Sequence, residues 1–178
     1  MQNDFITGSL AVSNGAEIIA PINELREKPC WDVIVRSRDW HQADHVSFCE
    51  NHPGQELFSK IIVQETGRDQ VMWPTHCVQG SDGANYHADL VKKDTDIEVL
   101  KGQIKTVESY SAFGDDGEET HLAEKLRAAG VTKVYCVGLA YDYCVGSTAE
   151  GAAQNGFETY LISDLAKSVA SATEEIMK

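Results

Sequence analysis

A cysteine at position 144 stands where a sulfur nucleophile could work. An apolar strand is predicted over Val134–Gly138, a short loop follows it, and Cys144 opens a helix predicted over Val145–Asn155. In a parallel sheet this is the carboxyl edge, where ligands bind. A helix N-terminus lowers the pKa of a thiol and offers N–H groups to a developing oxyanion. Cys144 is therefore a candidate nucleophile, with a buried structural cysteine as the alternative, the role expected for Cys136.

A lysine follows another predicted strand in the same way. The strand covers Ile97–Leu100 and ends at Lys101, beside Gly102. A lysine at the carboxyl edge can pair with a thiolate and keep it ionised. The alternative is a solvated surface lysine, so the case for Lys101 depends on its neighbours.

An aspartate and several histidines form a candidate metal site. Asp39 and His41 are two residues apart just after a strand, so an extended backbone points both side chains to one side. His45 follows four residues later, and His76 lies in the segment Trp73–Cys77. Such a set suits Zn²⁺, Fe²⁺ or Mn²⁺. The alternative is that each histidine is a hydrogen-bonded loop residue, which is expected for His52, His87 and His121.

Three aromatic residues lie in irregular segments beside these candidates. Phe5, Trp73 and Tyr110 could form the walls of a pocket for a flat ring. Ordinary core filling is the alternative, and it is expected for Phe48, Phe58 and Phe157.

The remaining elements predict an α/β fold. Helix-like and strand-like runs alternate, which favours three α/β/α layers around a central parallel sheet. Residues 39–86 show little periodicity and are predicted to form a long loop that binds metal and substrate, inside a single domain of residues 1–178. The other predicted elements are helices over Ala16–Glu27 and Glu119–Ala129, a strand over Trp31–Val35 that runs into Ser37–Asp39, and a strand over Thr159–Ile162.

Composition excludes several classes of protein. The 178 residues carry 15 lysines and arginines against 28 aspartates and glutamates, a net charge of −13. This acidity argues against binding to nucleic acid or to an anionic membrane. No apolar run is long enough to span a membrane, and Met1–Phe5 does not open a signal peptide. The five cysteines include no CxxC pair, which favours a reducing, cytoplasmic setting.

Taken together, the motifs resemble the nicotinamidase/pyrazinamidase group of the isochorismatase-like cysteine hydrolases. The matching segments occur in family order and cover nearly the whole chain. They are Met1–Phe5, Ser37–His41 with His45–Phe48, Trp73–Cys77, Lys101–Gly102, Ser109–Phe113 and Val137–Cys144.

The resemblance implies a role for each matching residue. Cys144 would be the nucleophile and Lys101 the lysine of a catalytic triad. Asp39, His41 and His76 would bind one divalent metal ion, zinc with iron or manganese as alternatives, and His45 is a further candidate ligand. The family's cis peptide matches Leu139–Ala140 and turns the Ala140 N–H toward the oxyanion, alongside the N–H of Cys144. Phe5, Trp73, Tyr110 and Tyr143 match positions that line the ring pocket.

The resemblance also implies a reaction and a missing residue. We expect metal-assisted hydrolysis of nicotinamide to nicotinate and ammonia in NAD salvage, activity on pyrazinamide, and a possible homo-oligomer. The family's triad aspartate directly precedes Met1, at the end of a first strand of a Rossmann-like sheet. We therefore expect the sequence to be truncated at both ends, with Lys178 in mid-helix. Alternatives are another amide or carbamoyl hydrolase, isochorismate-type vinyl ether hydrolysis, or an inactive scaffold that lacks the aspartate.

Overall fold

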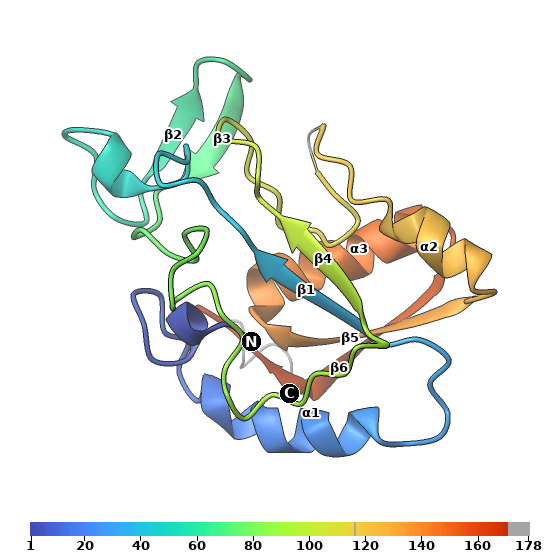
Figure 1. The fold of residues 1–178 in the computed structure, drawn as a ribbon. Coiled ribbons are helices and arrows are strands. Elements are labelled where there is room, and N and C mark those ends of the chain that lie inside the picture. The colour runs from blue at the N-terminus through green and yellow to red at the C-terminus, as the bar shows by residue number, and fades with distance from the viewer. Residues whose placement is uncertain (116, 171–178) are drawn as a thin grey trace.

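The computed structural model describes residues 1–115 and 117–170, coloured in Figure 1. The predicted helix around Lys178 therefore lies outside the described residues. The helices are α1 (Ile19–Arg26), α2 (Leu122–Ala128) and α3 (Gly146–Gln154), with short 3₁₀ turns at Asn3–Phe5, Gly15–Ile18 and Cys49–Asn51 and a π-helical turn at Tyr141–Val145. The strands are β1 (Val35–Asp39), β2 (Lys60–Val63), β3 (Arg68–Val71), β4 (Ile97–Lys101), β5 (Lys133–Leu139) and β6 (Glu158–Lys167).

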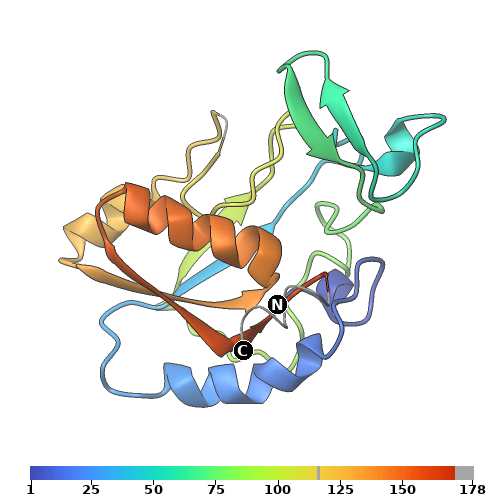
Figure 2. The same cartoon turned by 180° about the vertical axis from the view of Figure 1, so that it is seen from behind.

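The predicted α/β architecture is confirmed. Strands β1 and β4 pair in parallel, and so do β5 and β6. Helix α1 lies on one side of these strands, and α2 and α3 lie on the other (Figures 1 and 2). Among the described residues the parallel strands form two separate pairs, and a groove of about 270 Å³ lies between β1 and β5.

Apolar side chains hold each helix layer against the strands. Leu122 and Leu126 are one helical turn apart on α2, so both face inward, where they join Val99 of β4 and Phe157. On the opposite side, a second buried cluster surrounds Ile19 of α1. The strands therefore have buried contacts on both faces, as the continuous apolar strands predicted.

The region of residues 39–86 is more structured than predicted. It contains the antiparallel hairpin of β2 and β3, which projects away from the parallel strands in Figure 1. Each strand has only four residues, and β3 begins with the polar sequence Arg68–Gln70, so no clear alternating pattern was visible.

Four predicted elements begin later than expected. Helix α1 starts at Ile19 rather than Ala16, because Gly15–Ile18 forms a 3₁₀ turn before it. Strand β1 starts at Val35 rather than Trp31, because the Trp31 indole turns back and donates a hydrogen bond to the Leu25 carbonyl at 2.7 Å. Helix α2 starts after His121, whose φ of 57° cannot continue a right-handed helix. Helix α3 starts at Gly146, so Cys144 lies in the preceding π-helical turn.

No helix in the described part of the chain is both long and apolar enough to cross a bilayer.

Candidate active site

Asp39 and Lys101 meet because two parallel strands end together. They are the last residues of β1 and β4, and they are register partners in the strand pair. The Lys101 ammonium lies 2.5 Å from Asp39 Oδ1 and donates a hydrogen bond to the Ser109 carbonyl at 2.8 Å. Lys101 is only 2 % exposed, so this lysine is not a solvated surface residue.

Cys144 contacts the same ammonium. Cys144 lies in the turn that follows β5, and its Sγ accepts a hydrogen bond from Lys101 Nζ, at the end of β4, at 3.3 Å. Burial raises the pKa of the Cys144 thiol to about 12, although the Lys101 charge lowers it. The net pKa is therefore raised rather than lowered, because the loss of water outweighs the favourable charges.

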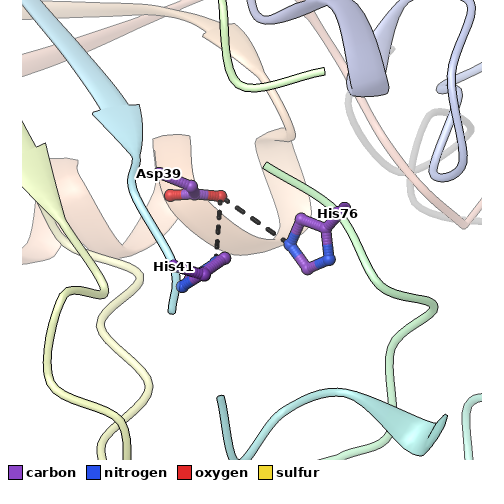
Figure 3. Close-up of side chains that lie close together, drawn as sticks. All are labelled: Asp39, His41 and His76. Atoms are coloured by element: carbon purple, nitrogen blue, oxygen red, sulfur yellow. Dashed lines mark ion pairs between the residues drawn. The ribbon is translucent and has the colours of Figure 1, made fainter. Parts of the chain in front are cut away.

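The second oxygen of Asp39 faces two imidazoles. Oδ2 lies 3.8 Å from His41 Nε2 and 3.9 Å from His76 Nε2 (Figure 3). His41 follows β1 directly, whereas His76 comes from a loop beyond the β2–β3 hairpin. One ligand atom from each of the three buried residues lies within 4.8 Å of the others, so the structure brings the predicted metal set together.

Backbone carbonyls select the tautomer of both histidines. His41 Nδ1 lies 2.8 Å from the Gly102 carbonyl, and His76 Nδ1 lies 2.8 Å from the Pro74 carbonyl. A carbonyl only accepts hydrogen bonds, so each Nδ1 carries the proton and each Nε2 presents a lone pair. The Nε2 lone pairs of His41 and His76 are therefore on the side of each ring that faces Asp39.

The charges in this cluster suit a cation. Burial raises the pKa of Asp39, but the Lys101 ammonium and the two imidazoles outweigh it and hold that pKa at about 2. Burial lowers the pKa of His41 to about 4 against the pull of Asp39, and burial and His41 lower the pKa of His76. At neutral pH the set is therefore one carboxylate and two neutral imidazoles, the protonation states that metal binding requires.

The residues fit a divalent ion. His41 Nε2 is buried and has no hydrogen-bond partner among the described residues, which is costly for a polar atom. Two ligands of one tetrahedral zinc ion lie about 3.4 Å apart, close to the 3.8 and 3.9 Å separations here. A cation coordinated by Asp39, His41 and His76 would satisfy the unpaired nitrogen.

His45 is placed differently from the other two histidines. Its ring is tilted against that of His41, with 4.3 Å between the ring centroids, and it forms a second possible ligand group with His41 and Glu108. However, His45 Nδ1 accepts a hydrogen bond from the Ser47 N–H at 3.3 Å, and Nε2 donates to the Val107 carbonyl at 3.1 Å. Both nitrogens are thus engaged, and His45 as a ligand stays a prediction.

The predicted ring-pocket residues gather beside the metal set and the thiol. Trp73 Nε1 donates a hydrogen bond to the Tyr110 hydroxyl at 2.9 Å, and the Tyr143 ring lies 4.7 Å from the Trp73 ring and 5.4 Å from the Tyr110 ring. The Phe5 ring lies 5.5 Å from His76. Phe5 therefore lies beside one imidazole of the metal set, and the other three rings form a cluster that includes Tyr143, the residue before Cys144.

Other predictions for single residues have mixed outcomes. The Leu139–Ala140 peptide is cis, as predicted. Phe48, Phe157 and Cys136 are buried, in agreement with their expected structural roles. Phe58 is not core: it is 57 % exposed, because its position at φ 64° in the loop before β2 leaves the ring with an edge contact to Trp73.

Sequence reasoning missed several polar residues around the site. Gln2 is 2 % exposed, and its amide exchanges two 2.8 Å hydrogen bonds with the Asp39 backbone, which fixes the end of β1. Gln2 lies within the first family motif, which was the available signal. Glu108, whose pKa is raised by burial, and Glu118 gave no signal, since their roles depend on contacts between distant segments.

Comparisons with known proteins show the family of this chain. Residues 1–177 match the family model described as the isochorismatase domain. A nicotinamidase of Acinetobacter baylyi is 40 % identical over 172 residues, which cover 95 % of this chain and 78 % of that protein.

Solved structures are similar over the same length. The yeast nicotinamidase bound to the inhibitor nicotinaldehyde has a TM-score of 0.92 at 34 % identity. The match covers 99 % of this chain and 89 % of the yeast chain. A pyrazinamidase of Pyrococcus horikoshii in complex with zinc has a TM-score of 0.79 at 36 % identity, covering 99 % and 87 %. With the family model matching nearly every residue, this chain belongs to the isochorismatase-domain family.

Proposed function

We propose that this protein is a nicotinamidase that hydrolyses nicotinamide to nicotinate and ammonia and also accepts pyrazinamide. The observation that carries the proposal is the Lys101 ammonium, which contacts both Cys144 Sγ and the Asp39 carboxylate that faces the histidines. The buried Lys101 ammonium thus links a candidate nucleophile to a candidate metal set. The nicotinamidases and the pyrazinamidase among its relatives support the substrate class.

The aromatic side chains and the metal set would position the substrate ring. A divalent ion held by Asp39, His41 and His76 would supply a Lewis acid for the ring nitrogen. Phe5, Trp73, Tyr110 and Tyr143 would pack against the ring and exclude water, as aromatic walls do in small-molecule sites. The neighbour that contains zinc supports Zn²⁺ as the ion.

In the proposed reaction Cys144 Sγ attacks the carboxamide carbon. Lys101 remains protonated, because the charges of Asp39 and Cys144 raise its pKa despite burial, so its ammonium stabilises the thiolate. The oxyanion would be bound by the N–H groups of Ala140 and Cys144, and such a donor contributes about 2.7–4 kcal/mol. The thiol proton would pass to the carboxylate that the family resemblance implies as proton acceptor, and from there to the leaving nitrogen. Collapse then breaks the C–N bond and releases ammonia, and water hydrolyses the thioester.

The proposal also includes the domain organisation, location and oligomeric state of the enzyme. We infer that residues 1–178 act as one catalytic domain, with residues 39–86 supplying metal and substrate contacts. All five cysteines are unpaired thiols, which supports a reducing cytoplasmic location. Nicotinate from the reaction would re-enter NAD synthesis, and a homo-oligomer stays a prediction.

The test compares Cys144→Ala with Cys30→Ala, which removes an exposed cysteine. Ammonia release is measured on nicotinamide and on benzamide, which has the same carboxamide but no ring nitrogen. We expect the unaltered protein and Cys30→Ala to hydrolyse nicotinamide much faster than benzamide, and Cys144→Ala to fall to the uncatalysed rate. Full activity in Cys144→Ala would refute covalent catalysis, and equal rates on both amides would refute recognition of the ring nitrogen.

A further inference from the structure

The side chain of Glu118 is buried against the turn that follows β4. It is 7 % exposed, and its two oxygens accept hydrogen bonds from consecutive backbone N–H groups, Oε2 from Gly102 and Oε1 from Gln103, each at 2.7 Å. Carboxylate hydrogen bonds of this length are strong. Gly102 and Gln103 form the turn that directly follows Lys101.

The second of these peptide groups connects Glu118 to His41. The Gln103 N–H and the Gly102 carbonyl belong to one peptide unit. Its N–H donates to Glu118, and its carbonyl accepts the hydrogen bond from His41 Nδ1 at 2.8 Å. Hydrogen bonds in such a chain polarise one another, so the carboxylate charge strengthens the bond to the imidazole. Metal-binding histidines commonly donate their other N–H to a carboxylate, and here a peptide group lies between the two.

The first peptide group makes a parallel connection. The Gly102 N–H and the Lys101 carbonyl belong to the preceding peptide unit, whose carbonyl accepts a hydrogen bond from the Trp40 N–H at 2.9 Å. Trp40 stands between Asp39 and His41. Glu118 therefore holds both peptide units that bind the end of β1.

The His41 ring also rests on this turn. A Cβ atom built on Gly102 would lie 2.3 Å from His41 Cε1, so the imidazole packs directly against the glycine backbone. A shift of the turn would consequently move the ring as well as change its hydrogen bond.

We propose that Glu118 is a positioning residue of the metal site. Acting through the two peptide units, its carboxylate keeps His41 in the Nδ1–H tautomer with Nε2 directed at Asp39 and His76, and it makes Nε2 a better ligand. This inference rests on the proposed metal set of Asp39, His41 and His76.

The central experiment compares Glu118→Gln with Glu119→Gln. Glutamine has the size of glutamate, but its NH₂ group would replace one of the two oxygens and face a backbone N–H, a donor against a donor. Glu119 is the adjacent, exposed glutamate and serves as the matched control. Dissociation constants for Zn²⁺ and Co²⁺ are measured by competition with a chromophoric chelator. We expect Glu118→Gln to weaken binding about 10–100-fold, and Glu119→Gln to bind as the unaltered protein does.

A second control separates positioning from general loosening of the fold. Thr120 Oγ1 donates to the Ala112 carbonyl at 2.7 Å and so braces the same segment without contacting the two peptide units. At saturating Co²⁺ we expect the visible absorption bands, which report the ligand field, to shift in Glu118→Gln and to stay unchanged in Thr120→Val. If Glu118→Gln does not fold, Glu118→Asp is used, since its shorter side chain cannot reach both N–H groups.

The outcomes distinguish this inference from the metal site on which it rests. His41→Ala is measured alongside and is expected to lose Zn²⁺ and Co²⁺ binding. If His41→Ala binds them normally, the metal site itself is wrong. If His41→Ala loses the metals while the Glu118 variant keeps normal affinity and an unchanged cobalt spectrum, the metal site stands and the role of Glu118 is overturned.

Discussion

At the scale of single residues, Asp39 is shared between Lys101 and two histidines. Its Oδ1 contacts the Lys101 ammonium, and its Oδ2 faces His41 and His76. The same ammonium reaches Cys144, so the charge of Lys101 supports both the carboxylate and the thiol. Burial raises the pKa of this partly buried thiol, and Lys101 is the main group that favours its ionised form.

The first prediction concerns the reactivity of Cys144. With a thiol pKa of about 12, the thiolate fraction is small at neutral pH, so alkylation by iodoacetamide should accelerate about tenfold per pH unit from roughly pH 7 to 10. Lys101→Met removes the charge that lowers this pKa, and we expect it to slow alkylation about tenfold or more at each pH. Peptide mass spectrometry separates Cys144 from the exposed Cys30.

The control for this prediction is Lys105→Met, which removes an exposed lysine paired with Asp44. It should leave the alkylation of Cys144 unchanged. A rate that levels off below about pH 9, or equal rates in Lys101→Met and the unaltered protein, would contradict the environment described for the thiol.

At the scale of elements, the site depends on where strands end. Strands β1 and β4 run in parallel and stop together, and the tight turn after β4 then supports the first residues after β1. That turn requires glycine at position 102, where φ is 64° and where the His41 ring leaves no room for a side chain. Gly130, which ends α2, has a similar φ of 73° but open space around it.

This pair of glycines provides a matched test. Gly130→Ala should lose about 1–2 kcal/mol of stability from the left-handed backbone alone and keep normal Zn²⁺ affinity. Gly102→Ala carries the same backbone cost and also displaces His41, so we expect it to be less stable and to bind Zn²⁺ about tenfold or more weakly. Chemical denaturation and chelator competition measure the two quantities. Equal Zn²⁺ affinity in both variants would show that the turn does not position His41.

At the scale of the whole molecule, the site joins segments that are far apart in the chain. Asp39 and Lys101 come from the parallel strands, Cys144 from the turn after β5, and His76 from the loop beyond the hairpin. A divalent ion held by Asp39, His41 and His76 would join the end of β1 to that loop in the folded state and not in the unfolded chain, so it would stabilise the fold by mass action.

We therefore expect divalent metal to raise the unfolding temperature. Zn²⁺ at 100 times its dissociation constant should add about 2.7 kcal/mol to the free energy of unfolding, and a chelator should remove this gain. His76→Ala should abolish the effect, whereas His87→Ala should keep it, because the His87 ring lies outside the metal set and accepts a hydrogen bond from the Asp89 N–H. Differential scanning calorimetry measures the shift. An unfolding temperature that does not respond to Zn²⁺ in the unaltered protein would argue against a metal site that spans these segments.

The amino-acid sequence by itself determined the α/β class, most of the helices and strands, and the candidates at strand ends. These features depend on short-range patterns: apolar runs for strands, helical spacing of Leu122 and Leu126, and the position of Lys101 and Cys144 just after a strand. The order of the motifs was also sufficient to indicate the family.

Only the tertiary structure decided which candidates meet and in what state. The pairing of Asp39 with Lys101 depends on the register of two strands about 60 residues apart. The different states of His41 and His45 depend on which distant carbonyl each ring contacts, and the raised pKa of Cys144 depends on how much water the folded chain excludes. Glu118 had no local signal, because its partners are backbone groups that packing brings within reach. Local sequence sets propensity, whereas register, burial and hydrogen-bond partners arise from contacts between segments that are distant along the chain.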